Sequence, residues 1–308
     1  MKILFPATNR VHLARQSTLL DMLSEHFDVV IVEPEKKEGN MEYQASRHGR
    51  WFSKMIHDHR PDLVLIRGDR FEMLPMAMVA VYAGVKVAHI EGGDQSGVVD
   101  NKVRHAITQL SDYHFATNNE AYSRLIRMGT DPDHTFNFGS LDVEFAHTAN
   151  ESGLKRIVDE PYVMIAFHPF PEEDGSILRG VIEHLDGLYK IVNITSNSDY
   201  GMEYKGESYE PLEYLSLLKH ANCLIGNSSS FLKEASIFGT PVVDIGTRQN
   251  NRLKPKNVVS VPYDSNMIIH TTDLLLNMGS FPQSDVYFKP DTSLHITNKL
   301  IELCQKKI

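Results

Sequence analysis

Short apolar runs rich in β-branched residues alternate with longer segments of helical periodicity along this chain. The alternation is typical of βαβ units, which build parallel sheets covered by helices. With 308 residues, the chain is long enough for two such domains, each with its own hydrophobic core. The sequence therefore predicts an α/β protein made of two Rossmann-like domains with parallel sheets.

The first half of the chain supplies one complete set of alternating elements. Its candidate strands are Lys2–Phe5, Val29–Val32, Leu63–Ile66, Val85–Ile90, Tyr113–Ala116 and Thr135–Asn137. Its candidate helices are Leu13–Glu25, Arg47–His59, Leu74–Tyr82, Lys102–Ser111 and Glu120–Met128. Because proline is tolerated only in the first turn of a helix, Pro75 places one helix start near Leu74.

A polar stretch, Ala149–Glu160, separates this set from a second one. It predicts an N-terminal domain of residues 1–150 and a C-terminal domain of residues 151–308. The second set contains candidate strands at 161–167, Ile191–Ile194, Cys223–Ile225, Val242–Ile245 and Val258–Val261, and candidate helices at Pro211–Lys219 and Ser230–Phe238. The last segment, Ser293–Lys307, is an amphipathic helix, which we expect to pack either on its own domain or back on the N-terminal one.

Composition and charge narrow the functional classes. A formal net charge of −9 argues against broad nucleic-acid binding, which needs a basic surface. No apolar run has the roughly 18–20 residues that span a bilayer, and the start predicts a first strand rather than a signal peptide. Cys223 and Cys304 lack the spacing of metal ligands. We therefore expect a protein of the reducing cytoplasm, without structural zinc or disulfides and without a nucleic-acid or membrane partner.

Two motifs follow strands of the first half directly, where open α/β sheets bind their ligands. The segment 68–72 (GDRFE) contains Asp69 and Arg70, and the alternative role for Asp69 is a helix cap. The segment 89–97 (HIEGGDQSG) contains Glu91, placed like a catalytic acid or base, and His89, which could orient it. Its alternative is a glycine-rich turn with solvated charges.

A third group lies on the helix that follows this glycine-rich segment. Asp100 and Arg104 are four residues apart and so share one helix face. A simple ion pair between them is the plain alternative. Because the helix follows the glycine-rich segment, the shared face could instead be directed toward the ligand.

The second half contains a pattern typical of phosphate binding. Segment 225–230 (IGNSSS) ends a strand and begins a helix, where backbone N–H groups and hydroxyls hold anions. Glu234 could accept hydrogen bonds from ribose hydroxyls, and Arg248 suits phosphate by charge and forked geometry. A serine helix cap is the alternative for this motif. His168 after a strand and Asn197 in a polar loop are further candidates for ligand contact.

Taken together, GDRFE, HIEGGDQSG with the following D-x-x-x-RHAIT, GNSSS-x-x-x-E and PVVDIGTRQ-x-x-R resemble the UDP-N-acetylglucosamine 2-epimerases. The IEGG-x-x-SG form resembles the hydrolysing branch, which releases free N-acetylmannosamine. The resemblance implies a glycosyltransferase-B-like pair of domains and a UDP-sugar substrate bound in the interdomain cleft, with UDP mainly on the second domain. A homodimer is a possible assembly, and no metal or redox cofactor is implied.

The resemblance also assigns roles to residues. It implies that the catalytic carboxylates are Asp69, Glu91 and Asp100, without saying which carboxylate performs which step. The substrate-binding residues that it implies, or that the motifs themselves point to, are Arg10, Arg70, His89, Arg104, His168, Asn197, Ser228, Ser229, Glu234 and Arg248.

The implied reaction removes the C2 proton of a UDP-N-acetylhexosamine as UDP leaves C1. Water then adds at C1 while a proton returns to the opposite face of C2. A UDP-sugar-dependent glycosyltransferase is the main alternative, because its fold and phosphate site are similar. A non-catalytic nucleotide-sugar sensor is a weaker one, because binding an anion gains nothing from three acidic residues.

Overall fold

The computed structural model describes residues 1–7, 13–34, 40–170, 172–197 and 203–305. It contains two compact units, of which one is Met1–Glu144 with Lys289–Ile308 and the other Phe145–Phe288. The division falls inside α7 (Leu141–Glu151), just ahead of the polar stretch Ala149–Glu160. Each unit is a parallel sheet with helices on both faces, so the predicted α/β class is confirmed.

The sheet of the first unit has the order β2-β1-β3-β4-β5-β6, and all its pairs are parallel. Its strands are β1 (Lys2–Pro6), β2 (Asp28–Val32), β3 (Leu63–Arg67), β4 (Lys86–Ile90), β5 (Tyr113–Ala116) and β6 (Thr135–Asn137). Every residue of β3 and β5 is buried, because helices cover both faces of the sheet. This double burial is why the strands read as continuous apolar runs.

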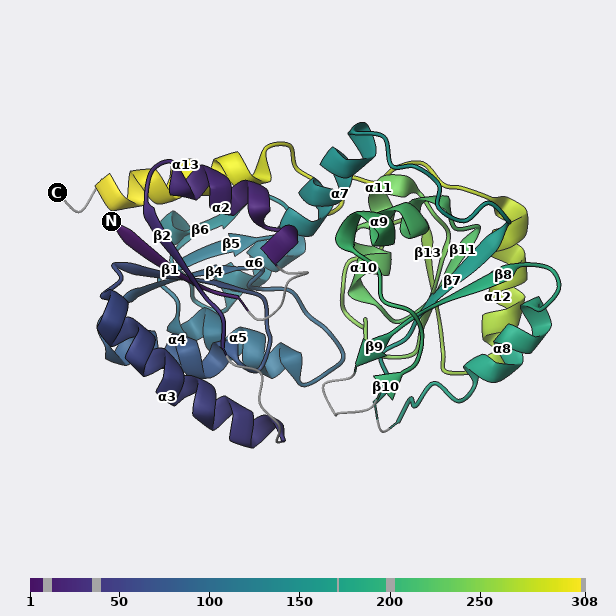
Figure 1. Cartoon of the computed structure of the whole chain (residues 1–308), viewed down its shortest axis with the longest axis horizontal. Coiled ribbons are helices and arrows are strands. Elements are labelled where there is room, and N and C mark those ends of the chain that lie inside the picture. The colour runs from purple at the N-terminus through teal and green to yellow at the C-terminus, as the bar shows by residue number, and fades with distance from the viewer. Residues whose placement is uncertain (8–12, 35–39, 171, 198–202, 306–308) are drawn as a thin grey trace. The chain divides into compact units, whose positions relative to one another are not determined.

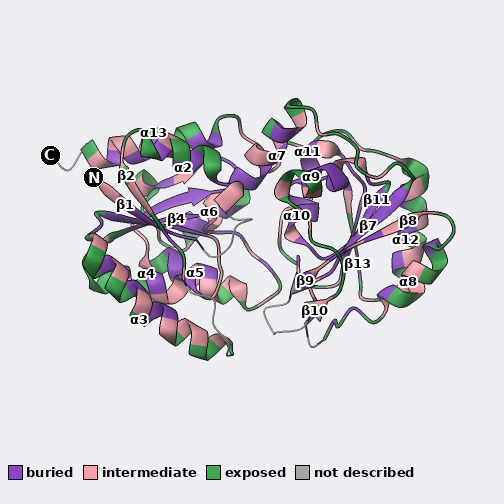
Figure 2. Cartoon of the chain, in the orientation of Figure 1, coloured by how far each residue is buried: buried purple, intermediate pink, exposed green. Residues whose placement is uncertain are grey.

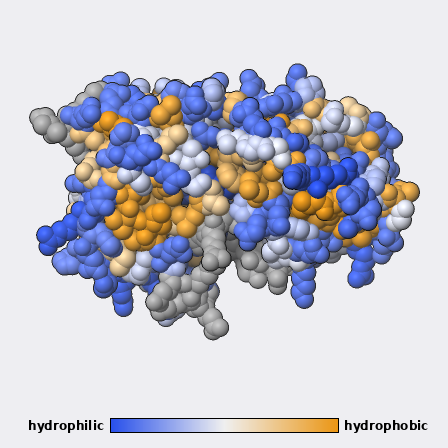
Figure 3. All heavy atoms as spheres, turned by 45° about the horizontal axis from the view of Figure 1, so that its top comes forward, coloured by the Kyte–Doolittle hydropathy of each residue, from blue (hydrophilic) through white to orange (hydrophobic). Residues whose placement is uncertain are grey.

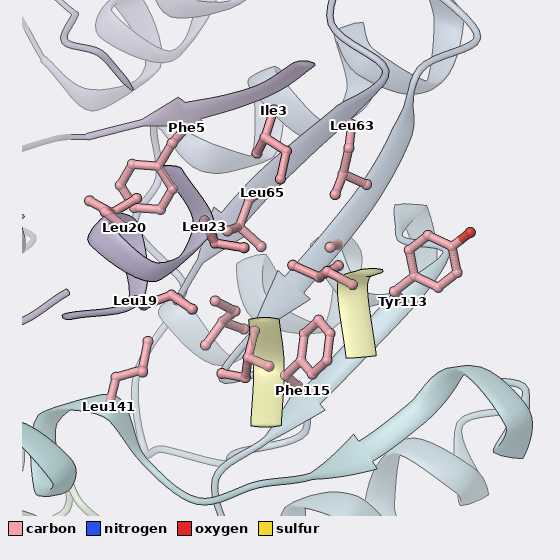
Figure 4. Close-up of a cluster of buried hydrophobic side chains, with 14 of the residues drawn as sticks. Ile3, Phe5, Leu19, Leu20, Leu23, Leu63, Leu65, Tyr113, Phe115 and Leu141 are labelled. Carbon is pink, nitrogen blue, oxygen red and sulfur yellow. The ribbon is translucent and has the colours of Figure 1, made fainter. Parts of the chain in front are cut away.

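Helices α2 (Ser17–Ser24) and α13 (Thr292–Gln305) cover one face of this sheet. Figure 4 shows part of the core on this face, a cluster that includes Leu19 and Leu23 of α2, Phe115 of β5, and Ile296 and Leu300 of α13. The other face carries α3 (Met41–His59), α4 (Met73–Tyr82) and α5 (Asp100–Leu110). The short helix α6 (Asn119–Arg127) lies between β5 and β6 in the chain.

The sheet of the second unit has the order β13-β12-β11-β7-β8 and is also parallel. Its strands are β7 (Tyr162–Ala166), β8 (Lys190–Ile194), β11 (Cys223–Gly226), β12 (Val242–Ile245) and β13 (Val258–Val261). Its longer helices are α8 (Leu178–Leu185), α9 (Pro211–His220) and α12 (Ser265–Met278), and a small hairpin is formed by β9 (Ser196–Asn197) and β10 (Glu203–Tyr204). The apolar side chains of α9 pack on one face and those of α8 and α12 on the other.

The prediction of one helix at Ser230–Phe238 is wrong, because the structure has two short helices there. They are α10 (Ser229–Leu232) and α11 (Ala235–Phe238), with a break at Lys233. The Ser236 hydroxyl donates to the Lys233 carbonyl oxygen at 2.6 Å. Such a local side-chain bond competes with helical backbone bonding, so it supports the break.

Both sheets change the direction of strand order at one point, between β1 and β3 and between β7 and β11. Ligands of open α/β sheets bind beyond the carboxyl ends of the strands at such points.

On the face drawn in Figure 3, hydrophilic residues cover most of the surface and apolar ones form smaller patches. Within the described part of the chain, no helix has the length and apolarity needed to cross a membrane.

Candidate functional site

Asp69 lies just beyond the carboxyl end of β3 and forms an ion pair with Arg104 of α5. The Arg104 side chain is 2% exposed, and it also donates to the backbone carbonyl of Asp94 at 2.9 Å. Asp69 does not cap a helix, because α4 begins at Met73 and its N-cap position is Glu72. The structure thus brings two predicted site residues together and ties both to the loop after β4.

Glu91 lies at the carboxyl end of β4 in a left-handed backbone conformation, with φ of 71°. A residue other than glycine adopts this conformation at a cost, and such residues cluster at functional sites. Its side chain is 13% exposed, and its Oε1 accepts from Nη2 of Arg67 at 2.9 Å. The same Nη2 lies 2.7 Å from Oδ1 of Asp142 at the start of α7.

Arg67 is a site residue that sequence reasoning missed, because it reads as the last residue of a buried strand, and its partner Asp142 was missed with it. The Arg67 side chain is only 5% exposed. Burial lowers the pKa of its guanidinium, but the carboxylates of Asp142 and Glu91 outweigh burial and raise the pKa well above its ordinary value. The signal was present in the sequence: an arginine ending an otherwise apolar strand, next to the GDRFE motif, requires a buried anionic partner.

The loop after β4 is held closely against α6. A Cβ on Gly93, which has φ of +80°, would lie 2.3 Å from the carbonyl oxygen of Ala121. Arg124 of α6 donates to the Gly93 carbonyl oxygen, and Asp94 accepts from the Thr117 hydroxyl at 2.9 Å. The glycine-rich segment is therefore a fixed support for Glu91 rather than a loose solvated turn.

His89 is placed behind this site, not on its surface. It is 0% exposed, with Nε2 at 2.9 Å from the Gly68 carbonyl oxygen and Nδ1 at 3.2 Å from the Thr108 hydroxyl. A neutral ring that donates from Nε2 and accepts at Nδ1 satisfies both partners. Burial lowers the pKa of His89 to about 4, which keeps the ring neutral. In this arrangement His89 supports the turn at Gly68, and its contact with the substrate stays a prediction.

Protein stability is expected to fall as the pH drops from about 6.5 toward 4, because unfolded His89 takes up a proton that the folded protein excludes. The contribution of His89 is present above the unfolded pKa and amounts to roughly 3 kcal/mol at full loss. Urea unfolding at several pH values measures it. His89→Gln should flatten this dependence without abolishing it, since burial also lowers the pKa of His114 to about 4. The control His26→Gln, at an exposed position, should leave the slope unchanged, and an unchanged slope in His89→Gln would contradict the assignment.

The other predicted residues of the first unit differ in their surroundings. Asp100 is the first residue of α5 and is partly exposed. Its neighbour on the helix face, Arg104, pairs with Asp69. Arg70 forms a forked pair with Glu72 at 2.7 and 3.2 Å and keeps 38% of its side chain exposed. Arg10 lies outside the described residues.

In the second unit, the point where strand order reverses is built around Asn227, which is 0% exposed. Its side chain accepts from the His168 backbone N–H at 2.7 Å and donates to the His168 carbonyl oxygen at 3.0 Å, so it joins the ends of β7 and β11. Arg248 and Gln249 both donate to the Asn227 carbonyl oxygen, at 3.1 and 2.7 Å. Gly226 makes this close approach sterically allowed, since a Cβ there would lie 2.0 Å from the Ala166 carbonyl oxygen.

The predicted serines continue this arrangement. The hydroxyls of Ser228 and Ser230 lie 2.8 Å apart, and the Ser230 hydroxyl lies 2.6 Å from that of Tyr214. Ser228 is the N-cap residue of α10 but makes no side-chain cap bond, while Ser229 is partly exposed at the first helical position. Serine capping alone therefore does not account for these hydroxyls.

The remaining predicted residues of the second unit are Glu234 and Asn197. Glu234 is 1% exposed at the junction of α10 and α11. Asn197 is described only by its backbone, in strand β9.

Glu173 is another residue that the sequence did not reveal. Buried at 4% exposure, it accepts from the backbone N–H and the hydroxyl of Thr247, at 2.9 and 3.0 Å. Burial raises the pKa of Glu173, although these two bonds oppose the rise. The contacts fix the turn that leads into Arg248. Within the described residues, no group of three or more His, Cys, Asp or Glu could hold a metal ion.

Comparison with known proteins assigns a family to this combination of motifs and folds. The family model described as UDP-N-acetylglucosamine 2-epimerase matches residues 9–301. A UDP-N-acetylglucosamine 2-epimerase of Neisseria meningitidis is 31% identical over 266 residues, which cover 79% of this chain and 71% of that protein. A UDP-N,N'-diacetylbacillosamine 2-epimerase (hydrolyzing) of Legionella pneumophila is 31% identical over 268 residues, with coverage of 79% and 71%.

Solved structures agree with this fold. The UDP-GlcNAc 2-epimerase of Neisseria meningitidis bound to UDP-GlcNAc aligns with a TM-score of 0.81 at 16% identity, covering 98% of this chain and 100% of the other. The Methanocaldococcus jannaschii enzyme in complex with UDP-GlcNAc and UDP also gives 0.81, at 19% identity and the same coverage. At these identities the likeness establishes the fold alone.

Proposed function

Because the chain belongs to the UDP-N-acetylglucosamine 2-epimerase family, we propose that it converts a UDP-N-acetylhexosamine into UDP and a free N-acetylmannosamine-type sugar. The observation that carries the proposal is the pair of carboxylates at neighbouring strand ends. Asp69 and Glu91 each face a buried arginine, Arg104 and Arg67 respectively. Structural capping does not explain either carboxylate, and both lie where an open α/β sheet binds its ligand.

The hydrolysing outcome is the finer part of this proposal. It is supported by the IEGG-x-x-SG form of segment 90–97 and by relatives whose names include "hydrolyzing", from Legionella pneumophila and Campylobacter jejuni. The latter is 30% identical over 238 residues. The names of these relatives give a nucleotide-linked diacetylbacillosamine as their substrate. The substrate proposed for this chain is therefore UDP-N-acetylglucosamine or a UDP-linked relative with another acetamido sugar.

The proposed reaction balances without an added oxidant or reductant. One carboxylate removes the proton from C2, the electron pair of that C–H bond forms the C1=C2 double bond, and the C1–O bond to UDP breaks. Water then adds its oxygen to C1 and loses a proton to a base, while the electron pair of the double bond takes a proton from an acid on the opposite face of C2. Loss of UDP makes the weakly acidic C2 proton removable, so stabilising the leaving diphosphate is part of the catalysis.

The second unit holds the groups that suit this diphosphate. Arg248 is positioned by its bond to the Asn227 carbonyl oxygen, and Ser229 lies at the first position of α10. A guanidinium and the free backbone N–H groups of a helix start are strong donors to phosphate oxygens. We propose that UDP binds at this end of the sheet, and that His168, Asn197 and Glu234 contact the nucleoside.

Incubation with UDP-N-acetylglucosamine in D₂O, followed by NMR, tests the proposed function. The expected products are UDP and a free N-acetylhexosamine of the manno configuration that carries deuterium at C2. UDP-N,N'-diacetylbacillosamine is the second substrate to be tried. A product still linked to UDP would contradict hydrolysis, and a free sugar that keeps its original C2 hydrogen would contradict elimination. Release of UDP only with an added sugar acceptor would indicate a glycosyltransferase.

A further inference from the structure

The side chain of Arg67, the last residue of β3, makes contacts that the proposed reaction by itself does not explain. Its Nη2 contacts two carboxylates at once, Glu91 at 2.9 Å and Asp142 at 2.7 Å, and all three side chains are at most 13% exposed. Its Nε and Nη1 are buried and have no hydrogen-bond partner among the described residues. Burying an arginine with such donors costs free energy of folding. The two carboxylate contacts of Arg67 have to offset that cost.

The net charge of the three side chains Arg67, Glu91 and Asp142 depends on the second carboxylate, that of Asp142. Arginine stays protonated, so the group carries one net negative charge when Glu91 and Asp142 are both ionised. If Glu91 takes up a proton, Arg67 and Asp142 remain as a neutral ion pair. Without Asp142, the same step would leave a buried cation with no carboxylate partner, which is strongly unfavourable.

We propose that Arg67 is a positioning residue which, by sharing its guanidinium between Glu91 and Asp142, fixes the Glu91 carboxylate and sets how readily it exchanges a proton. The catalytic meaning of this arrangement rests on the proposed function, in which Glu91 is one of the proton-transferring groups. The backbone of Glu91 has a left-handed φ of 71°, and residues strained in this way cluster at functional sites.

Other charged side chains of the described residues lie near this cluster. Arg15, which precedes α2, lies 3.6 Å from Asp142 and shares its negative charge. His89 of β4 interacts electrostatically with Glu91 but is neutral, because burial lowers its pKa to about 4. On α5, Arg104 is paired with Asp69. None of these groups should change charge between pH 5 and 8, so they should not mask the effect that a change at Arg67 or Asp142 has on Glu91.

The test is a titration of the Glu91 carboxyl carbon by ¹³C NMR in protein labelled at glutamate Cδ, with Glu91→Gln identifying the signal. Asp142→Asn should move the titration midpoint of Glu91 down by about 1 pH unit, because Arg67 is then left to Glu91 alone. Arg67→Gln should move it up by about 1 unit or more, because the cation is gone and Asp142 remains. The limb of the kcat/KM profile that reports Glu91 should shift in the same two directions.

Opposite shifts are the distinguishing result, since general loosening of the structure would move both midpoints toward that of free glutamate. Lys86→Gln is the matched control: it removes an ion pair with Asp112 at the opposite end of β4 and should leave the midpoint unchanged. If Arg67→Gln does not fold, Asp142→Asn alone decides. Shifts in the same direction, or an unmoved midpoint in Asp142→Asn, would overturn the proposal. A wild-type protein without turnover would refute the proposed function while the titration still tests the charge sharing.

Discussion

Glu91→Gln, Asp69→Asn and Asp100→Asn are each expected to lower turnover by about 10²–10⁴, the usual contribution of general acid–base catalysis. An amide keeps the shape of the carboxylate but neither takes nor gives a proton in this pH range. In Glu91→Gln the amide oxygen still accepts from Arg67, and Asp142 keeps that arginine paired, so the fold should persist. Steady-state kinetics with UDP-N-acetylglucosamine measures the loss, and calorimetry of UDP binding should show little change.

Asp112→Asn is a suitable control for this series. Asp112 pairs with Lys86 and accepts from the Val87 backbone N–H at 2.9 Å, so it is an ion-paired carboxylate beside the same strand, at the end away from Glu91. The rate should be unaffected by this substitution. If a site variant instead keeps its rate and loses several degrees of melting temperature, its carboxylate has a structural role and must be removed from the mechanism.

Gly226→Ala is expected to destabilise the second unit by roughly 3–5 kcal/mol, the combined cost of backbone strain and overpacking. Gly226 has φ of +149°, and its added Cβ would lie 2.0 Å from the Ala166 carbonyl oxygen in the neighbouring strand. Neither the backbone of β7 nor that of β11 can withdraw without breaking their register. Urea unfolding gives the free energy, and UDP affinity should fall with it, because Asn227 and the start of α10 follow directly.

Gly84→Ala separates the two components of this effect. Gly84 also has a positive φ, of +72°, but a Cβ there would meet nothing within 4 Å. Only the conformational cost of about 1–2 kcal/mol is expected there. Equal losses in the two variants would show that the approach of Gly226 to Ala166 carries no energetic weight and would weaken the case for a tightly built anion site.

The sequence predicted the strands well because their signal is local. Runs such as Leu63–Arg67 and Tyr113–Ala116 are buried on both faces, so apolarity alone marks them. Helices were less evident: α7, α8 and α12 were not predicted, although Leu178, Val181 and Leu185 form a regular buried face on α8. Helix α3 begins earlier than expected, at Met41, because none of its residues before His48 is buried. The break between α10 and α11 depends on contacts of Lys233 and Ser236 that periodicity does not report.

By itself, the sequence determined the fold class and the motifs that lie at strand ends, because both depend on residues close together in the chain. The tertiary structure decided which of these side chains act together. Arg104 pairs with Asp69 across 35 residues, and Arg67 reaches Glu91 across 24. The Asp100–Arg104 ion pair, the plain alternative from the sequence, considers one helix face only, whereas the partner of a buried arginine depends on the whole core around it. Parallel strands bring loops that are distant in the chain to one edge of a sheet. A charge buried there without a partner is costly, so each buried arginine needs a carboxylate. Which carboxylate that is depends on the folded structure and not on neighbours in the sequence.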